Sequence, residues 1–124
     1  MIGWRGRIGF LTPSAHNIAS EWQQLLPRGG EMVVVTLSIE RLFPEEFERL
    51  FNLYQPAAEY LAKYRVGIII CGGTPILTHH GYDKSIEMAK RIEEATGVPT
   101  RSQLTNQVDA LNKLSAKKIV MAAN

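Results

Sequence analysis

The stretch from Cys71 to Pro75 joins the only cysteine of the chain to two glycines, a threonine and a proline. A cysteine thiolate can act as a nucleophile or move a proton, and glycines let successive backbone N–H groups point at an anion. The same cysteine ends an apolar run, where a buried and inert thiol is common. The sequence therefore leaves two readings of Cys71 open, a catalytic thiol or a core residue, and the glycines could equally make a tight turn.

A second polar loop, residues 12–17, reads TPSAHN. Ser14, His16 and Asn17 are side-chain hydrogen-bonding groups, although His16 and Asn17 could instead cap the helix that follows. Together with residues 71–74 they would suit a carboxylate or a phosphate. The set lacks the lysine of a P-loop and the glycine spacing of a dinucleotide site.

Alternating strand and helix patterns must position these two loops. The strand patterns cover residues 7–12, 31–39, 66–71, 98–102 and 117–122, and the helical patterns cover 17–26, 43–65, 80–95 and 103–114. This alternation predicts an α/β fold with a doubly wound parallel sheet between two layers of helices. In a flavodoxin-like strand order, 2-1-3-4-5, the first and third strands are neighbours, and their loops meet at the carboxyl edge where ligands bind.

Details of the helices also follow from the pattern. Pro56 should kink or divide the helix over residues 43–65. Trp22 and Leu25 fall on the predicted buried face of the first helix, and Ile86 and Ala95 on that of the helix over 80–95.

The length and composition of the chain limit the classes of function and location that it can have. With 124 residues, of which 45% are hydrophobic, the chain predicts one domain spanning residues 1–124. The 14 basic and 12 acidic residues nearly balance, which gives no electrostatic case for a nucleic-acid partner. No apolar run reaches the length of a membrane span, and the N-terminus has no signal-peptide pattern. A single cysteine favours a cytoplasmic location.

Metal ligands are also scarce in the sequence. The three histidines are His16 and the pair His79–His80, and no cysteine or carboxylate spacing makes them a ligand set. His79 and His80 are interpreted as exposed turn residues, and no metal site is predicted.

Longer stretches carry a resemblance to a known family. The segment from Gly72 to Ala123, with its GGTP turn, its EATGVP helix end and a basic pair before the last strand pattern, resembles the N-terminal half of the arylmalonate decarboxylase and maleate cis–trans isomerase group. This group lies in the aspartate/glutamate racemase superfamily. The stretch IGFLTPSAHN is similar to the family's first-strand loop. The resemblance covers nearly all of this chain but only one lobe of the two-lobe fold.

The resemblance implies cofactor-free isomerase or decarboxylase chemistry on a small dicarboxylate, by a cysteine thiolate. Thr74 matches the threonine that donates to a carboxylate, and Pro13 and Ser14 match the loop on the other side of that group. Cys71 is then the candidate catalytic residue. The expected carboxylate-binding residues are Pro13, Ser14, His16, Asn17, Gly72, Gly73, Thr74 and Pro75, without metal or cofactor.

The sequence differs from the family's pattern in three respects. Gly73, not Cys71, stands where the isomerases and racemases carry the cysteine of their N-terminal half, while the decarboxylases carry glycine there and rely on a cysteine in the other half. The family's loop asparagine falls at His16 without a gap, or at Asn17 after a shift of one residue. We also expect residues 1–124 to lack the family's second lobe. A non-catalytic module that assembles as a homodimer or higher oligomer is therefore the alternative function.

Overall fold

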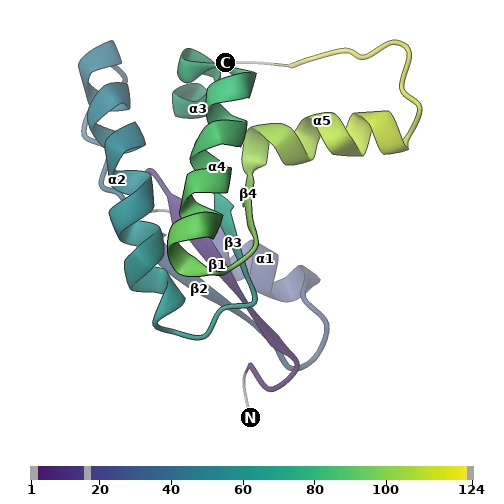
Figure 1. The fold of residues 1–124 in the computed structure, drawn as a ribbon. Coiled ribbons are helices and arrows are strands. Elements are labelled where there is room, and N and C mark those ends of the chain that lie inside the picture. The colour runs from purple at the N-terminus through teal and green to yellow at the C-terminus, as the bar shows by residue number, and fades with distance from the viewer. Residues whose placement is uncertain (1–2, 16–17, 123–124) are drawn as a thin grey trace.

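Four parallel strands and five helices make up the computed structural model, which describes residues 3–15 and 18–122 (Figure 1). In chain order the elements are β1 (Gly6–Thr12), α1 (Ile18–Leu25), β2 (Gly30–Thr36), α2 (Pro44–Ala62), β3 (Ile68–Cys71), α3 (Thr74–His80), α4 (Tyr82–Thr96), β4 (Thr100–Ser102) and α5 (Gln103–Lys113). The strand order is β2-β1-β3-β4. This confirms the predicted α/β class and the position of β1 beside β3.

The register aligns the strands so that residues of one row share a face of the sheet. Leu11 of β1 pairs with Val35 of β2 and with Cys71 of β3, and Cys71 pairs with Ser102 of β4. Leu11, Cys71 and Ser102 are all fully buried, so this row lies in the main core. The next row, which includes Phe10 and Ile70, faces the opposite side because side chains alternate along a strand.

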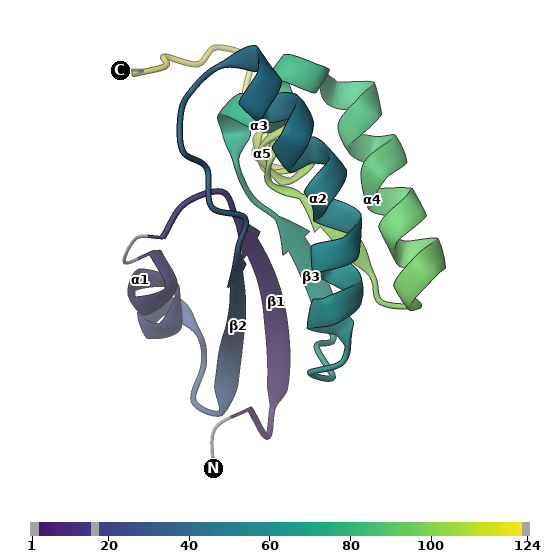
Figure 2. The same ribbon diagram turned by 90° about the vertical axis from the view of Figure 1, so that its left-hand side faces the viewer.

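The two faces of the sheet are covered unequally. Helices α2 and α4 lie over one face and α1 lies over the other (Figure 2). The main core belongs to the first face, where Leu50, Tyr54 and Leu61 of α2 are fully buried. Gly9 of β1 allows α2 to come close, since a Cβ there would stand 2.6 Å from the Cδ2 atom of Leu61.

On the α1 side the predicted burial is wrong. Trp22 is 45% exposed and Leu25 is 79% exposed, because α1 has only eight residues and covers little of its face. On α4, Ile86 and Ala95 are also exposed. On the same face of α4, Ala89 and Ile92 are buried as predicted, so Ile86 and Ala95 lie at the margins of that face. The sequence pattern identified the apolar positions but could not show how little of each helix is covered in the described ranges.

Three predicted elements differ from the structure. α2 continues through Pro56 as one helix, since both Pro56 and Asn52 are exposed and water can satisfy the unpaired carbonyl. The glycine-rich turn is followed at once by α3, a short helix that the sequence analysis did not predict, since its predicted helix began only at residue 80. Residues 117–122 form no strand. They run away from the sheet after α5 (Figure 1), where no neighbouring strand offers hydrogen bonds.

None of the helices in the described ranges combines the length and the apolar character that crossing a membrane requires.

Candidate functional site

The loops after β1 and β3 meet at the carboxyl edge of the sheet, as predicted. Residues Leu11 and Cys71 are paired neighbours in the sheet, and the backbone N–H of Gly72 donates to the carbonyl of Leu11 at 2.8 Å. The segments that follow β1 and β3 therefore leave the sheet side by side. A cavity of about 280 Å³ opens beyond them.

Five of the predicted carboxylate-binding residues line this cavity. They are Pro13, Ser14, Gly73, Thr74 and Pro75. The fold thus brings together residues that are far apart in the sequence, and it does so through the pairing of β1 with β3. His16 and Asn17, also predicted for this site, lie outside the residues that the structure describes.

Gly73 adopts a backbone conformation that favours glycine. It precedes α3 with φ of 108° and ψ of 68°, in the left-handed half of the map that other residues avoid. A Cβ atom here would stand 2.9 Å from the hydroxyl oxygen of Tyr54 and 3.0 Å from Cγ of Pro13. Both the backbone angle and the close neighbours therefore require glycine at position 73.

Gly72 does not line the cavity, and its backbone N–H and carbonyl are both hydrogen-bonded within the protein. Its N–H is bound to Leu11, and its carbonyl accepts a hydrogen bond of 2.5 Å from the hydroxyl of Tyr54. Tyr54 is fully buried in α2, and this burial, followed by repulsion from the thiolate that Cys71 would carry at very alkaline pH, raises its pKa. The phenol therefore stays protonated and donates to the loop, so α2 braces the turn that presents Gly73 and Thr74.

Gln103 is a site residue that the sequence analysis missed. Its Oε1 atom accepts a hydrogen bond from the backbone N–H of Gly73 at 3.1 Å, and its side chain lines the cavity. Gln103 begins α5 directly after β4. The rule that drew attention to the ends of β1 and β3 could also have found it, because β4 is the next strand in the sheet.

Apolar side chains form much of the remaining wall. Trp22 comes from α1, while Ile39 and Leu42 come from the segment after β2. Other lining residues are Phe10, Thr12 and Ile76. Apart from Thr12, which begins the predicted polar loop, the sequence analysis placed none of these near the site, since large apolar residues are more often part of a core.

The lining offers neutral hydrogen-bonding groups and no charged side chain within the described residues. Thr74 is half-buried at the start of α3, and its hydroxyl has no partner in residues 3–15 and 18–122. Such a hydroxyl, together with backbone N–H groups, can donate to an anion. The apolar wall can contact the carbon skeleton of the same ligand.

Cys71 lies on the core side of the sheet, away from the lining of the cavity. Its side chain is fully buried, and this burial raises the pKa of the thiol to about 12. A thiol held protonated in an apolar core is a poor nucleophile and a poor base. The arrangement favours the reading of Cys71 as a core residue over that of a catalytic thiol.

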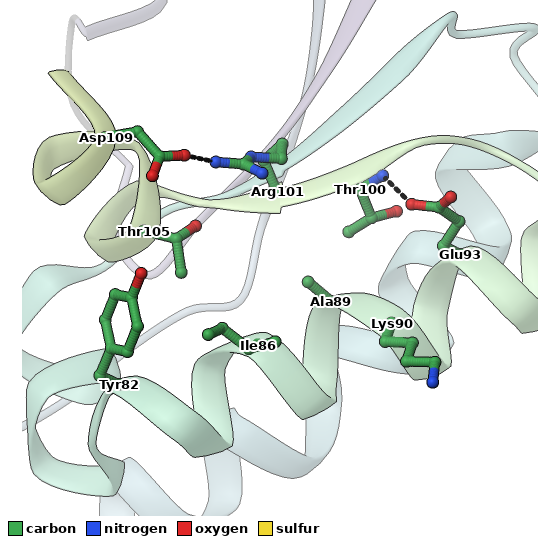
Figure 3. A pocket seen from close by; sticks show the side chains of 9 residues that line it. All are labelled: Tyr82, Ile86, Ala89, Lys90, Glu93, Thr100, Arg101, Thr105 and Asp109. Atoms are coloured by element: carbon green, nitrogen blue, oxygen red, sulfur yellow. Dashed lines mark hydrogen bonds and ion pairs between the residues drawn. The ribbon is translucent and has the colours of Figure 1, made fainter. Parts of the chain in front are cut away.

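A second cavity, of about 300 Å³, lies between α4, β4 and α5 (Figure 3). Three of its four charged side chains are engaged with the protein itself: Arg101 pairs with Asp109, and the Glu93 carboxylate accepts from the N–H of Thr100 at 3.1 Å, while Lys90 is the fourth. It includes neither of the loops that follow β1 and β3. The cavity at the carboxyl edge is therefore the better candidate for a binding site.

Comparison of the chain with known proteins identifies a matching family and similar folds. The arylmalonate decarboxylase family profile matches residues 8–124. No curated protein matches the chain in sequence.

Solved structures share the fold. A double mutant of arylmalonate decarboxylase in its liganded form superposes with a TM-score of 0.78 at 19% sequence identity, over 89% of this chain and 47% of the other. A maleate isomerase variant from Pseudomonas putida S16 with maleate superposes with a TM-score of 0.77 at 16% identity, over 90% of this chain and 50% of the other. The chain thus spans about half the length of these proteins.

The burial of Cys71 predicts slow chemical labelling. Alkylation of the native chain should be slow across neutral and mildly alkaline pH, because the thiolate is scarce and the sulfur is inaccessible, and it should accelerate sharply on unfolding in urea. Mass spectrometry of samples quenched over time measures both rates. Fast labelling of the folded chain, with a pH midpoint below the ordinary cysteine value, would contradict this placement.

The conformation of Gly73 predicts a stability loss on substitution. Gly73→Ala should lower the free energy of unfolding by about 1–3 kcal/mol from backbone strain and crowding against Tyr54 and Pro13. Gly97→Ala is the matched control, since Gly97 has φ of 69° but open space around its Cβ position. Urea denaturation should show the larger loss for Gly73→Ala, and equal losses would exclude the crowding.

Proposed function

The chain belongs to the arylmalonate decarboxylase family, and we propose that it forms one lobe of an enzyme that decarboxylates or isomerises a small dicarboxylate. The substrate would resemble an arylmalonate or maleate. The observation that carries the proposal is that Pro13, Ser14 and Thr74, the residues that match the family's carboxylate loops, line a single cavity. Two turns from separate strands would therefore enclose one carboxylate group.

Neutral donors suit the chemistry of such a substrate. When a carboxylate leaves as CO₂, or an α-proton is removed, negative charge gathers on the carboxylate that remains. Donors already aimed at those oxygens stabilise that charge without reorganising. The Thr74 hydroxyl and the Thr74 backbone N–H, at the start of α3, would be these donors. Gln103 would be a positioning residue, because its Oε1 atom holds the N–H of Gly73.

The apolar wall would select the rest of the substrate. Trp22, Ile39 and Leu42 lie on the cavity surface, where an aryl ring or an alkene could pack against them. Contacts of this kind hold the carbon skeleton while the polar turn holds the carboxylate. Their mixture with hydroxyl donors fits an organic acid better than an inorganic anion.

The thiolate required by the family's chemistry would come from another part of the enzyme. Cys71 is buried and protonated, and the described lining contains no cysteine. The chain covers about half of its solved relatives. We therefore place the catalytic cysteine on a second lobe, facing the cavity formed by residues 13–14 and 73–75, and we propose no cofactor.

A second candidate function is assembly with a further copy of the chain. The α1 face of the sheet carries a partly covered apolar cavity of about 190 Å³. It is lined by Ile8, Phe10, Trp22, Met32, Ile68, Ile70 and Asn106. Exposed apolar surface of this kind is often covered by a partner, and a second copy could also complete a cleft at the carboxyl edge.

The role of Thr74 can be tested by substitution in the complete enzyme. Thr74→Ala should weaken the binding of maleate or phenylmalonate by about 2 kcal/mol, roughly thirtyfold, through loss of one hydrogen bond to a charged group. Calorimetric titration measures the affinity.

Two variants control this test. Thr78→Ala removes a hydroxyl one turn further along α3 that bonds the carbonyls of Thr74 and Pro75, and it should bind normally. Thr74→Ser keeps the hydroxyl and should restore most of the affinity. Unchanged binding by Thr74→Ala would remove the main support for the proposed site.

The assembly candidate predicts a concentration-dependent mass. In sedimentation experiments the chain should form a dimer or larger species at high micromolar concentration, and Met32→Lys should return it to a monomer by placing a charge on the apolar face. Met121→Lys, in the exposed segment after α5, is the control and should leave the mass unchanged. A wild-type chain that stays monomeric would rule this candidate out.

A further inference from the structure

The two ends of α3 have different surroundings. Its first residue, Thr74, lies in the candidate site, and its last residues, His79 and His80, lie against α2. There the fold brings in a carboxylate that the sequence spacing did not suggest, that of Glu48. The sequence analysis predicted no metal site because it had no such third residue.

The three side chains converge on one point. The Nε2 atom of His79 and the Nδ1 atom of His80 each lie 3.8 Å from Oε1 of Glu48. One ligand atom from each residue lies within 4.8 Å of the other two. Donors around a tetrahedral Zn²⁺ stand about 3.3 Å apart for bond lengths near 2.0–2.1 Å, so small side-chain rotations would close the site around an ion.

A hydrogen bond orients the lone pair of His80 toward this point. Its Nε2 atom lies 3.4 Å from the carbonyl oxygen of Phe47. A carbonyl can only accept, so Nε2 carries the proton and Nδ1 presents its lone pair. Metal-binding histidines commonly use their second nitrogen in this way, to fix the tautomer and the ring orientation.

Aromatic neighbours hold both rings in place. The His80 ring stacks on Phe51 with centroids 3.9 Å apart, and the His79 ring meets Phe47 edge-on at 5.4 Å. The His80 side chain is 11% exposed, that of His79 is 35% exposed and that of Glu48 is 61% exposed. One side of the cluster therefore packs on α2, and the other side is open to solvent, so that an ion could enter.

We propose that Glu48, His79 and His80 form a binding site for a divalent transition metal, with Zn²⁺ as the best match. Two imidazole nitrogens and one carboxylate oxygen suit zinc, cobalt or nickel and do not suit Mg²⁺ or Ca²⁺, which prefer oxygen ligands. Water would complete the coordination. The bound ion would clamp the end of α3 to α2 and so steady the short helix that begins at Thr74, whatever ligand the cavity binds.

Zinc titration of the wild-type chain, free of any histidine tag, tests the site. Calorimetry should show one saturable Zn²⁺ site, and the melting temperature should rise with added Zn²⁺ because the ion binds the folded state. Glu48→Gln and His79→Ala should each lower the affinity by about tenfold or more. Excess Mg²⁺ should not compete.

His80 requires a more careful variant because its ring is packed on Phe51. His80→Phe keeps an aromatic ring there and removes Nδ1, so it should lose zinc binding while the chain stays folded by circular dichroism. Glu59→Gln is the matched control for Glu48→Gln: Glu59 is exposed on α2, well along the helix from the cluster. Absence of saturable binding by the wild type, or affinities equal to wild type in all three cluster variants, would overturn the proposal.

Discussion

The parallel pairing of β1 with β3 is the constraint on which the candidate site depends. With Leu11 opposite Cys71, the next residues of both strands emerge at one edge, and the hydrogen bond from Gly72 to Leu11 keeps them together. A shift of one residue in β3 would turn Cys71 toward the other face of the sheet, since side chains alternate. The same register therefore joins the two loops at the cavity and keeps the thiol in the core.

Helix α2 extends that constraint to the loop after β3. The Tyr54 hydroxyl holds the carbonyl of Gly72 from within the core, and the crowding around Gly73 leaves no room for a side chain. If the proposed metal site exists, α2 also holds the far end of α3 through Glu48. A short helix would then be fixed at both ends, which is how a lobe with only neutral donors could present Thr74 in a defined position.

The sequence predicted the parts of this arrangement that local chemistry determines. Glycines before Thr74 and a polar loop after the first strand pointed to the carboxyl edge, and the strand–helix alternation identified the fold. Gln103 could have been found from the predicted strand order, but the apolar wall was missed because its place depends on how α1 and the segment after β2 pack beside the sheet. The predicted strand over residues 117–122 fails for the same reason, since apolar residues form a strand only beside another. The distance from Glu48 to His79 likewise appears only once α2 and α3 are packed.

The central claim is that a carboxylate binds between the turns after β1 and β3. The most direct measurement is a maleate titration of the isotope-labelled chain, followed by the backbone amide resonances of each residue. The account predicts saturable shifts concentrated at Ser14, Gly73, Thr74 and Gln103, with little change across the cavity between α4 and α5. Shifts centred on that other cavity, or no saturable change at residues 13–14 and 73–75, would contradict it.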